Sequence, residues 1–97
     1  MKSTDECLEL LKHFKETNAG KYGIRRLGVF GSVARGEQRE DSDVDVCLEI
    51  DTPSMFKLVH IKEDLQKLFN CKIDIIRLRD KMDSALRVRI EKEGLYV

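Results

Sequence analysis

The sequence lacks the features that mark several large classes of protein. It carries no net charge, because 18 Lys and Arg balance 18 Asp and Glu among 97 residues. It therefore lacks the positive field that supports general binding to nucleic acid. No apolar run approaches the roughly 18 residues of a membrane span, and the start turns acidic where a secretory signal would be apolar. These absences favour a cytoplasmic protein that is not anchored in a membrane.

Cysteine and histidine are also scarce. The three cysteines, Cys7, Cys47 and Cys71, are odd in number and widely spaced, which disfavours a disulfide framework or a thiolate zinc site. The two histidines, His13 and His60, fall on predicted helices with no second ligand four residues away, so no histidine zinc site is expected. Scattered, unpaired cysteines agree with a reducing compartment.

Hydrophobic periodicity predicts one α/β domain over residues 1–97, with a small mixed sheet and helices packed on it. Apolar residues make up 41% of the chain and charged residues 37%, which is typical of an ordered domain with a heavily charged surface. The predicted order is helix 3–20, strand 24–30, a short helix, polar loop 36–42, strand 43–50, helix 55–69, strand 72–78, a helix from 82 toward Gly94, and a tail 95–97.

Local signals mark the ends of these helices. Ser3 and Glu6 fit a capping box, and Ser54 is a candidate N-cap for the second long helix. The segment 18–20, which ends in a glycine, is expected to stop the first helix, and Asn70 to stop the second long one.

Three aspartates form the first candidate site. Asp43 and Asp45 lie two residues apart in a predicted strand, so their carboxylates face the same way. Asp74 lies between Ile73 and Ile75, in what the pattern indicates is a covered strand where a charge is costly. If the two strands are neighbours, three carboxylates converge. Such a set can hold two Mg²⁺ ions for phosphoryl or nucleotidyl transfer.

A second candidate site follows the first strand. Gly31 allows close approach to the backbone, and the Ser32 hydroxyl and the N–H groups of a helix start can donate to phosphate oxygens. Arg35 and Arg39 lie in the following excursion and could neutralise phosphate charge. Each feature alone also has a structural explanation, since a Gly-Ser pair is often a turn and Asp-x-Asp a solvated strand end.

Taken in series, these segments resemble the signature of the polymerase-β-like nucleotidyltransferase superfamily. Gly31-Ser32 is followed after ten residues by Asp43-Val44-Asp45, and Asp74 lies in the apolar setting expected of a third carboxylate. The strings 31–37 and 42–46, and the closing segment 89–96, are similar to the minimal nucleotidyltransferase branch. The resemblance covers the whole chain.

The resemblance implies a polymerase-β-like fold and an Mg²⁺-dependent activity that uses ATP. Members of this branch often act as antitoxins of HEPN-type ribonuclease toxins, some by transferring AMP to a toxin tyrosine. By this resemblance, Gly31 and Ser32 would hold the phosphates. The carboxylates would bind two Mg²⁺ ions, with Asp74 also drawing the acceptor proton. The second-tier candidates are Arg35, Glu37 and Arg39.

Two other functions stay open at this point. One is a non-catalytic antitoxin that occludes its partner, although unneutralised carboxylates would then destabilise the fold. The other is transfer to a small molecule, for which a chain of 97 residues leaves little room to build an acceptor pocket. The basic cluster Lys21, Arg25 and Arg26 is either solvated or flanks a nucleotide or partner. Partner contact is also open for the C-terminal arginines Arg77, Arg79, Arg87 and Arg89.

Overall fold

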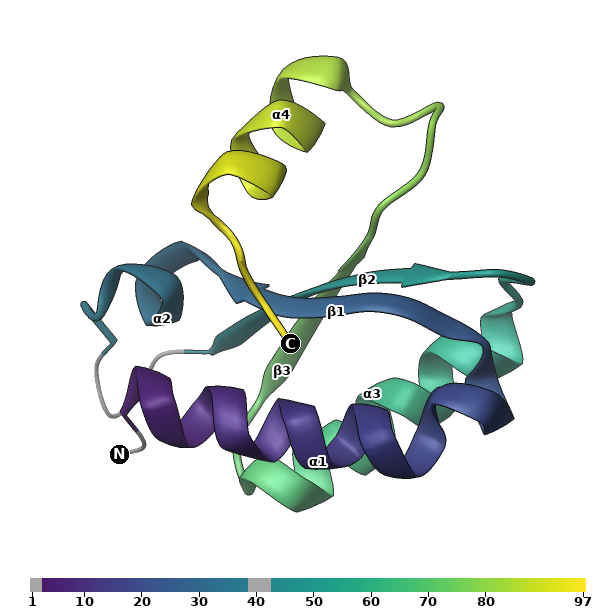
Figure 1. Ribbon diagram of the computed structural model, residues 1–97, viewed down its shortest axis with the longest axis horizontal. Helices are drawn as coiled ribbons and strands as arrows, with labels where there is room; N and C mark the ends of the chain where they lie inside the picture. The colour runs from purple at the N-terminus through teal and green to yellow at the C-terminus, as the bar shows by residue number, and fades with distance from the viewer. Residues whose placement is uncertain (1–2, 39–42) are drawn as a thin grey trace.

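A computed structural model describes residues 3–38 and 43–97, which form a four-stranded sheet with helices on both faces (Figure 1). The elements are α1 (Thr4–Tyr22), β1 (Ile24–Phe30), α2 (Gly31–Arg35), β2 (Val44–Ile50), α3 (Met55–Phe69), β3 (Ile73–Arg77), α4 (Ser84–Glu93) and β4 (Leu95–Tyr96). The strand order is β3-β2-β1-β4, with β1 antiparallel to both neighbours and β2 parallel to β3. The predicted α/β class and mixed sheet are confirmed.

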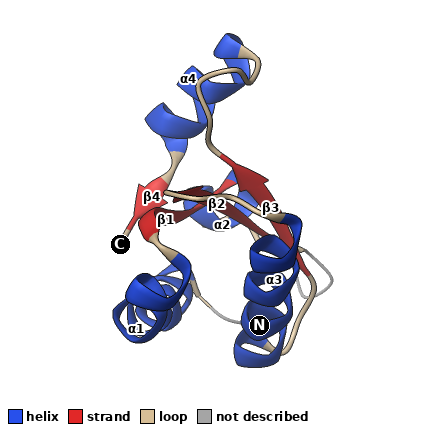
Figure 2. Ribbon diagram, turned by 90° about the vertical axis from the view of Figure 1, so that its right-hand side faces the viewer, coloured by secondary structure: helices blue, strands red, loops and turns tan. Residues whose placement is uncertain are grey.

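The two faces of the sheet are covered unequally. Helices α1 and α3 lie side by side on one face, and α4 lies on the other (Figure 2). The side chains of β2 alternate between these two faces. Val44, Val46 and Leu48 pack in the α1–α3 core, while Cys47 faces α4. The core beneath α4 is small and consists of Cys47, Leu78, Met82 and Ile90. Most of the apolar burial therefore lies on the face away from α4.

The helix caps agree with the sequence except at the end of α1. The Ser3–Glu6 capping box is present, Ser54 accepts from an amide of α3, and Asn70 adopts a left-handed conformation at the end of α3. The predicted stop at 18–20 is wrong, because α1 continues to Tyr22 and ends at Gly23.

Packing of Tyr22 explains this longer helix. Tyr22 is buried, stacks on Phe14 with 6.4 Å between ring centroids, and donates from its hydroxyl to Asp64 of α3 at 2.8 Å. These contacts offset the cost of about 1 kcal/mol for a glycine, here Gly20, inside a helix.

The C-terminal tail is part of the sheet. Leu95 and Tyr96 form β4, which pairs with Val29 and Gly28 of β1. A strand of two residues is too short to show an alternating pattern, so this pairing between distant parts of the chain was not predicted. Gly28 permits it, because a Cβ at this position would overlap the carbonyl oxygen of Leu95.

Strand β3 is an edge strand, which corrects the expectation that Asp74 lies in a covered strand. Ile73 is buried, but Asp74 and Ile75 are half-buried, so the Asp74 charge keeps contact with solvent. Strands β2 and β3 are each slightly shorter than predicted at their ends.

The two arginines of the basic cluster near β1 form ion pairs with residues at and just after β2. Arg25 lies 3.2 Å from Asp51 and Arg26 lies 2.7 Å from Glu49, measured from Nε to a carboxylate oxygen. In the part of the chain that the structure describes, no helix combines the length and apolar character needed to cross a membrane.

Two glycine substitutions test the packing of β4. Gly28→Ala should destabilise the protein, because the added Cβ would overlap the Leu95 carbonyl and lie 2.9 Å from the Tyr96 ring. Overpacking of this kind costs about 1–3 kcal/mol, which lowers the melting temperature of a domain this size by roughly 5–20 °C.

Gly20→Ala is the matched control, because nothing lies within 4 Å of a Cβ there. It removes a helix-interior glycine and should raise the melting temperature by several degrees. Thermal melts followed by circular dichroism measure both. A Gly28→Ala protein that melts at or above the wild-type temperature would contradict the packing of β4 on β1.

Candidate active site

The junction between β1 and α2 brings the backbone against a carboxylate. Gly31 has a φ of +69°, which side-chain-bearing residues rarely adopt. A Cβ at Gly31 would lie only 2.5 Å from Oδ2 of Asp45. Asp45 is placed there by the antiparallel register, in which it is the partner of Phe30. The two predicted motifs therefore meet, and glycine is required at their contact.

The parallel pairing of β2 and β3 brings the second and third aspartates together. Asp45 and Asp74 are direct partners in the register, which confirms that their strands are neighbours. Burial raises the pKa of Asp45, and the carboxylates of Asp74 and Asp43 raise this pKa further, whereas Arg35 lowers it. Asp43 and Asp74 are thus each close enough to Asp45 to repel its carboxylate. Asp43 also lies 3.8 Å from Nζ of Lys72.

The donor chemistry of this cluster fits a hard cation. Carboxylate oxygens are the ligands that Mg²⁺ prefers, and a bound cation would relieve the repulsion that raises the Asp45 pKa. Over residues 3–38 and 43–97, however, no three His, Cys, Asp or Glu side chains are gathered closely enough to form a ready-made metal site. Assignment of metal ligands to Asp43, Asp45 and Asp74 stays a prediction.

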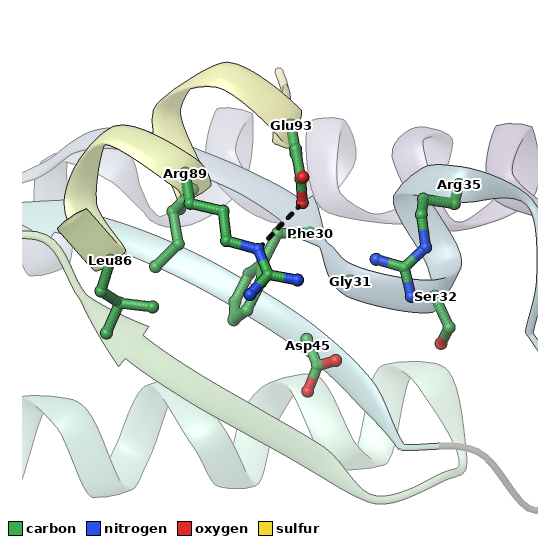
Figure 3. Close-up of a pocket in the computed structure, with 9 residues that line it drawn as sticks. Phe30, Gly31, Ser32, Arg35, Asp45, Leu86, Arg89 and Glu93 are labelled. Carbon is green, nitrogen blue, oxygen red and sulfur yellow. Dashed lines mark ion pairs between the residues drawn. The ribbon is translucent and has the colours of Figure 1, made fainter.

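A cavity of about 360 Å³ lies beside this cluster (Figure 3). Residues of the β1–α2 junction form one side, α4 forms the other, and Asp45 lies between them. The lining residues are Phe30, Gly31, Ser32, Arg35, Asp45, Leu86, Arg89, Ile90 and Glu93. Four of the predicted site residues therefore share one cavity.

The remaining predicted residues lie near the cavity or outside the described structure. Asp74 lines a neighbouring groove of about 260 Å³ against α3. Asp43 precedes β2. Glu37 pairs with Arg35, with 3.1 Å between a carboxylate oxygen and Nε. Arg39 lies outside the described residues.

The α4 wall of the cavity was not predicted as part of the site. The sequence suggested a partner contact for Arg89 and a family resemblance for residues 89–96, whereas the structure places Arg89 in the cavity with Leu86, Ile90 and Glu93. A sequence signal did exist, because these residues recur three or four positions apart and so share one helix face. What the sequence could not indicate is that this face would lie opposite Asp45.

Comparison with known proteins agrees with this geometry. The family described as "Nucleotidyltransferase domain" matches residues 9–97. Protein adenylyltransferase MntA of Thermococcus cleftensis is 32% identical over 98 residues, which cover all of this chain and 98% of its own. A protein of Methanocaldococcus jannaschii with a provisional protein-adenylyltransferase name is 34% identical over 100 residues, covering both chains in full.

Solved structures share the fold. One that is provisionally described as a minimal nucleotidyltransferase has a TM-score of 0.75 and 32% identity, over 91% of this chain and 93% of its own. A toxin–antitoxin structure with AMP-PNP gives a TM-score of 0.74 with 19% identity, over 91% and 69% of the chains. A complex of a tri-AMPylated Shewanella oneidensis HEPN toxin with an MNT antitoxin gives 0.59 with 16% identity, over 96% and 66%. The last two likenesses concern the fold alone.

The family match and its relatives define an enzyme of nucleotidyl transfer, and the glycine-serine turn beside Asp45, whose sheet partner is Asp74, agrees with that class. The chain belongs to the nucleotidyltransferase domain family, and its fold is that of the minimal nucleotidyltransferases.

A double-mutant cycle tests the contact between Gly31 and Asp45. Gly31→Ala should lower stability by about 1–3 kcal/mol, because it strains the backbone and presses on the carboxylate. In an Asp45→Ala background the overlap between the added Cβ and the carboxylate is absent, and only the backbone strain remains. We therefore expect a coupling free energy of at least about 0.5 kcal/mol between the two positions in thermal or urea unfolding. Additive effects would mean that the carboxylate does not constrain position 31.

Proposed function

We propose that this chain transfers AMP from ATP to a tyrosine hydroxyl of a HEPN-type toxin and thereby acts as its antitoxin. The observation that carries the proposal is the cavity in which Gly31, Ser32 and Arg35 face Asp45, with Asp74 beside it. Relatives named protein adenylyltransferase, and the likeness to a complex that contains an AMPylated HEPN toxin, support this choice of substrate and acceptor.

The turn after β1 would hold the β- and γ-phosphates. Gly31 has no side chain, so phosphate oxygens can approach the backbone, and the Ser32 hydroxyl supplies one more donor. The Arg35 guanidinium supplies positive charge on the same side of the cavity. Asp45 lines the same cavity, so phosphates held at this turn would lie beside its carboxylate.

The carboxylate on β3 would act on the acceptor. A tyrosine hydroxyl has an ordinary pKa near 10 and needs a base to react at neutral pH. Asp74 would take its proton while the phenolate oxygen bonds to the α-phosphorus. The bond from the α-phosphorus to the bridging oxygen breaks, and pyrophosphate leaves.

Asp43, Asp45 and Asp74 would hold the magnesium ions. When bound, these ions would neutralise phosphate charge and favour ionisation of the acceptor hydroxyl. The carboxylates of this chain would also relieve their own mutual repulsion on binding, since the pKa of Asp45 is raised by both neighbours.

Two structural features favour a protein acceptor. The cavity lies near the lower end of the about 300–1,000 Å³ typical of ligand pockets, so a nucleotide would fill it. The groove that contains Asp74 is bordered by Val59, which lies one turn from Met55 and Phe56 on α3. Met55 and Phe56 are 76% and 80% exposed, as expected of an apolar surface that a partner covers.

Label transfer tests the reaction. With α-³²P-ATP, label should move from the nucleotide to a co-expressed HEPN-type toxin, and excess chelator should stop it. Asp45→Asn should lower the transfer rate by at least about 100-fold. Its melting temperature should stay the same or rise, because the fold disfavours the charged form of Asp45 and the substitution removes that charge.

Asp51→Asn is the control, since Asp51 is exposed and pairs with Arg25 away from the cavity. A complex that protects against the toxin without moving label would favour the occluding antitoxin instead. Label moved equally well by Asp45→Asn would remove this carboxylate from the site.

Asp74→Asn separates the transfer step from nucleotide binding. We expect MgATP affinity within about tenfold of wild type and a transfer rate at least about 100-fold lower, because the acceptor loses its base. Since Asp74 is half-buried on an edge strand, its loss should change the melting temperature little. A folded Asp74→Asn protein that transfers at the wild-type rate at saturating MgATP would exclude Asp74 from catalysis.

A further inference from the structure

Arg89 extends from α4 into the cavity (Figure 3). Its Nε lies 3.6 Å from a carboxylate oxygen of Glu93, which lines the same cavity one helical turn away. The Arg89 side chain is 71% exposed, so this ion pair lies largely in water and contributes little to stability. Arg89 is thus a cation in the cavity with a weak internal partner.

Arg87, two residues earlier, is held quite differently. Its guanidinium lies 2.9 Å from Asp80 and 3.0 Å from Glu91, and its side chain is 29% exposed. Arg87 ties α4 to the segment before it and does not line the cavity. The comparison indicates that Arg89 is not needed to hold α4 in place.

The charge balance of the cavity gives Arg89 a role. The ionisable side chains that line it are Arg35, Asp45, Arg89 and Glu93. Among the described residues, two cations balance two carboxylates, so this part of the lining would be net negative without Arg89 and would repel a triphosphate. Arg35 alone would then face two carboxylates of the lining, Asp45 and Glu93, so it would not make the cavity positive.

We propose that Arg89 binds the β- and γ-phosphates of the nucleotide. In the unbound chain the Arg89 guanidinium is paired with Glu93, and the phosphates replace Glu93 when the nucleotide binds. This inference rests on the proposed function, because it requires a nucleoside triphosphate in the cavity. Arginine makes paired hydrogen bonds to phosphate oxygens, which are stronger than an exposed pair to a carboxylate. The exchange from Glu93 to phosphate is therefore favourable. It brings α4 and the β1–α2 turn onto the same triphosphate.

Calorimetry on the full chain tests the exchange without using the reaction. The probes are an ATP analogue with a non-hydrolysable α–β linkage, and AMP, each with Mg²⁺. Arg89→Gln should lower the affinity for the ATP analogue by about tenfold or more and leave the affinity for AMP nearly unchanged. Glu93→Gln should raise the affinity for the analogue severalfold, because Arg89 no longer has to leave its ion pair with Glu93. In Arg89→Gln/Glu93→Gln, the gain from Glu93→Gln should disappear.

Lys92→Gln is the matched control, because it removes one positive charge from an exposed position of α4 that does not line the cavity. Wild-type affinity in Arg89→Gln, or equal losses for the analogue and for AMP, would overturn the phosphate assignment. A gain from Glu93→Gln that persists without Arg89 would overturn the exchange. A wild-type chain that binds neither probe would instead refute the proposed function itself.

Discussion

The close approach of the Asp45 carboxylate to the backbone at Gly31 is the contact on which the cavity depends. It follows from the antiparallel register of β1 and β2, in which Asp45 is the partner of Phe30. A slip of one residue would turn every side chain of β2 to the other face and direct Asp45 into the α1–α3 core. Val44 and Val46, buried in that core, hold the register against such a slip. The burial of Val44 and Val46 on one face of β2 thereby fixes the Asp45 carboxylate on the other face.

Polar and aromatic contacts hold α4 over the sheet, where the apolar core is small. Arg26 lies 2.7 Å from Glu49 of β2 and 3.3 Å from Glu91 of α4, and its guanidinium lies 5.7 Å from the centroid of the Tyr96 ring. Burial, together with neighbouring Cys47, raises the pKa of Tyr96 to about 12. Its hydroxyl donates to the Ile90 carbonyl at 3.4 Å. These contacts connect the wall of the cavity to the strands that carry its carboxylates.

The carboxylates of Asp43, Asp45 and Asp74 oppose the stability of the fold, and their oxygen atoms have the donor chemistry that suits a hard cation. Asp45 is half-buried beside Asp43 and Asp74, and its raised pKa reflects both the burial and the repulsion. A chain selected for stability alone would gain from neutral residues here. A cation bound beside these carboxylates would relieve the repulsion, and this relief would add to its binding free energy. The zero net charge of the whole chain conceals this local concentration of negative charge.

The sequence by itself determined the elements and motifs whose causes are local. The alternation in β2 and the caps at Ser3, Ser54 and Asn70 depend on residues a few positions apart, and all are present. The motif at Gly31 and Ser32 could be matched to Asp45 by its spacing, and the structure brings these residues into one cavity.

Only the tertiary structure decided the features that join distant segments. The end of α1 depends on Tyr22 meeting Asp64, β4 depends on Leu95 reaching Gly28, and the edge position of Asp74 depends on strand order. The α4 wall with Arg89 likewise faces Asp45 only because the chain crosses to the second face of the sheet. Local propensities and periodicity carry no information about these pairings, because their free energy comes from contacts that form only once the sheet is assembled.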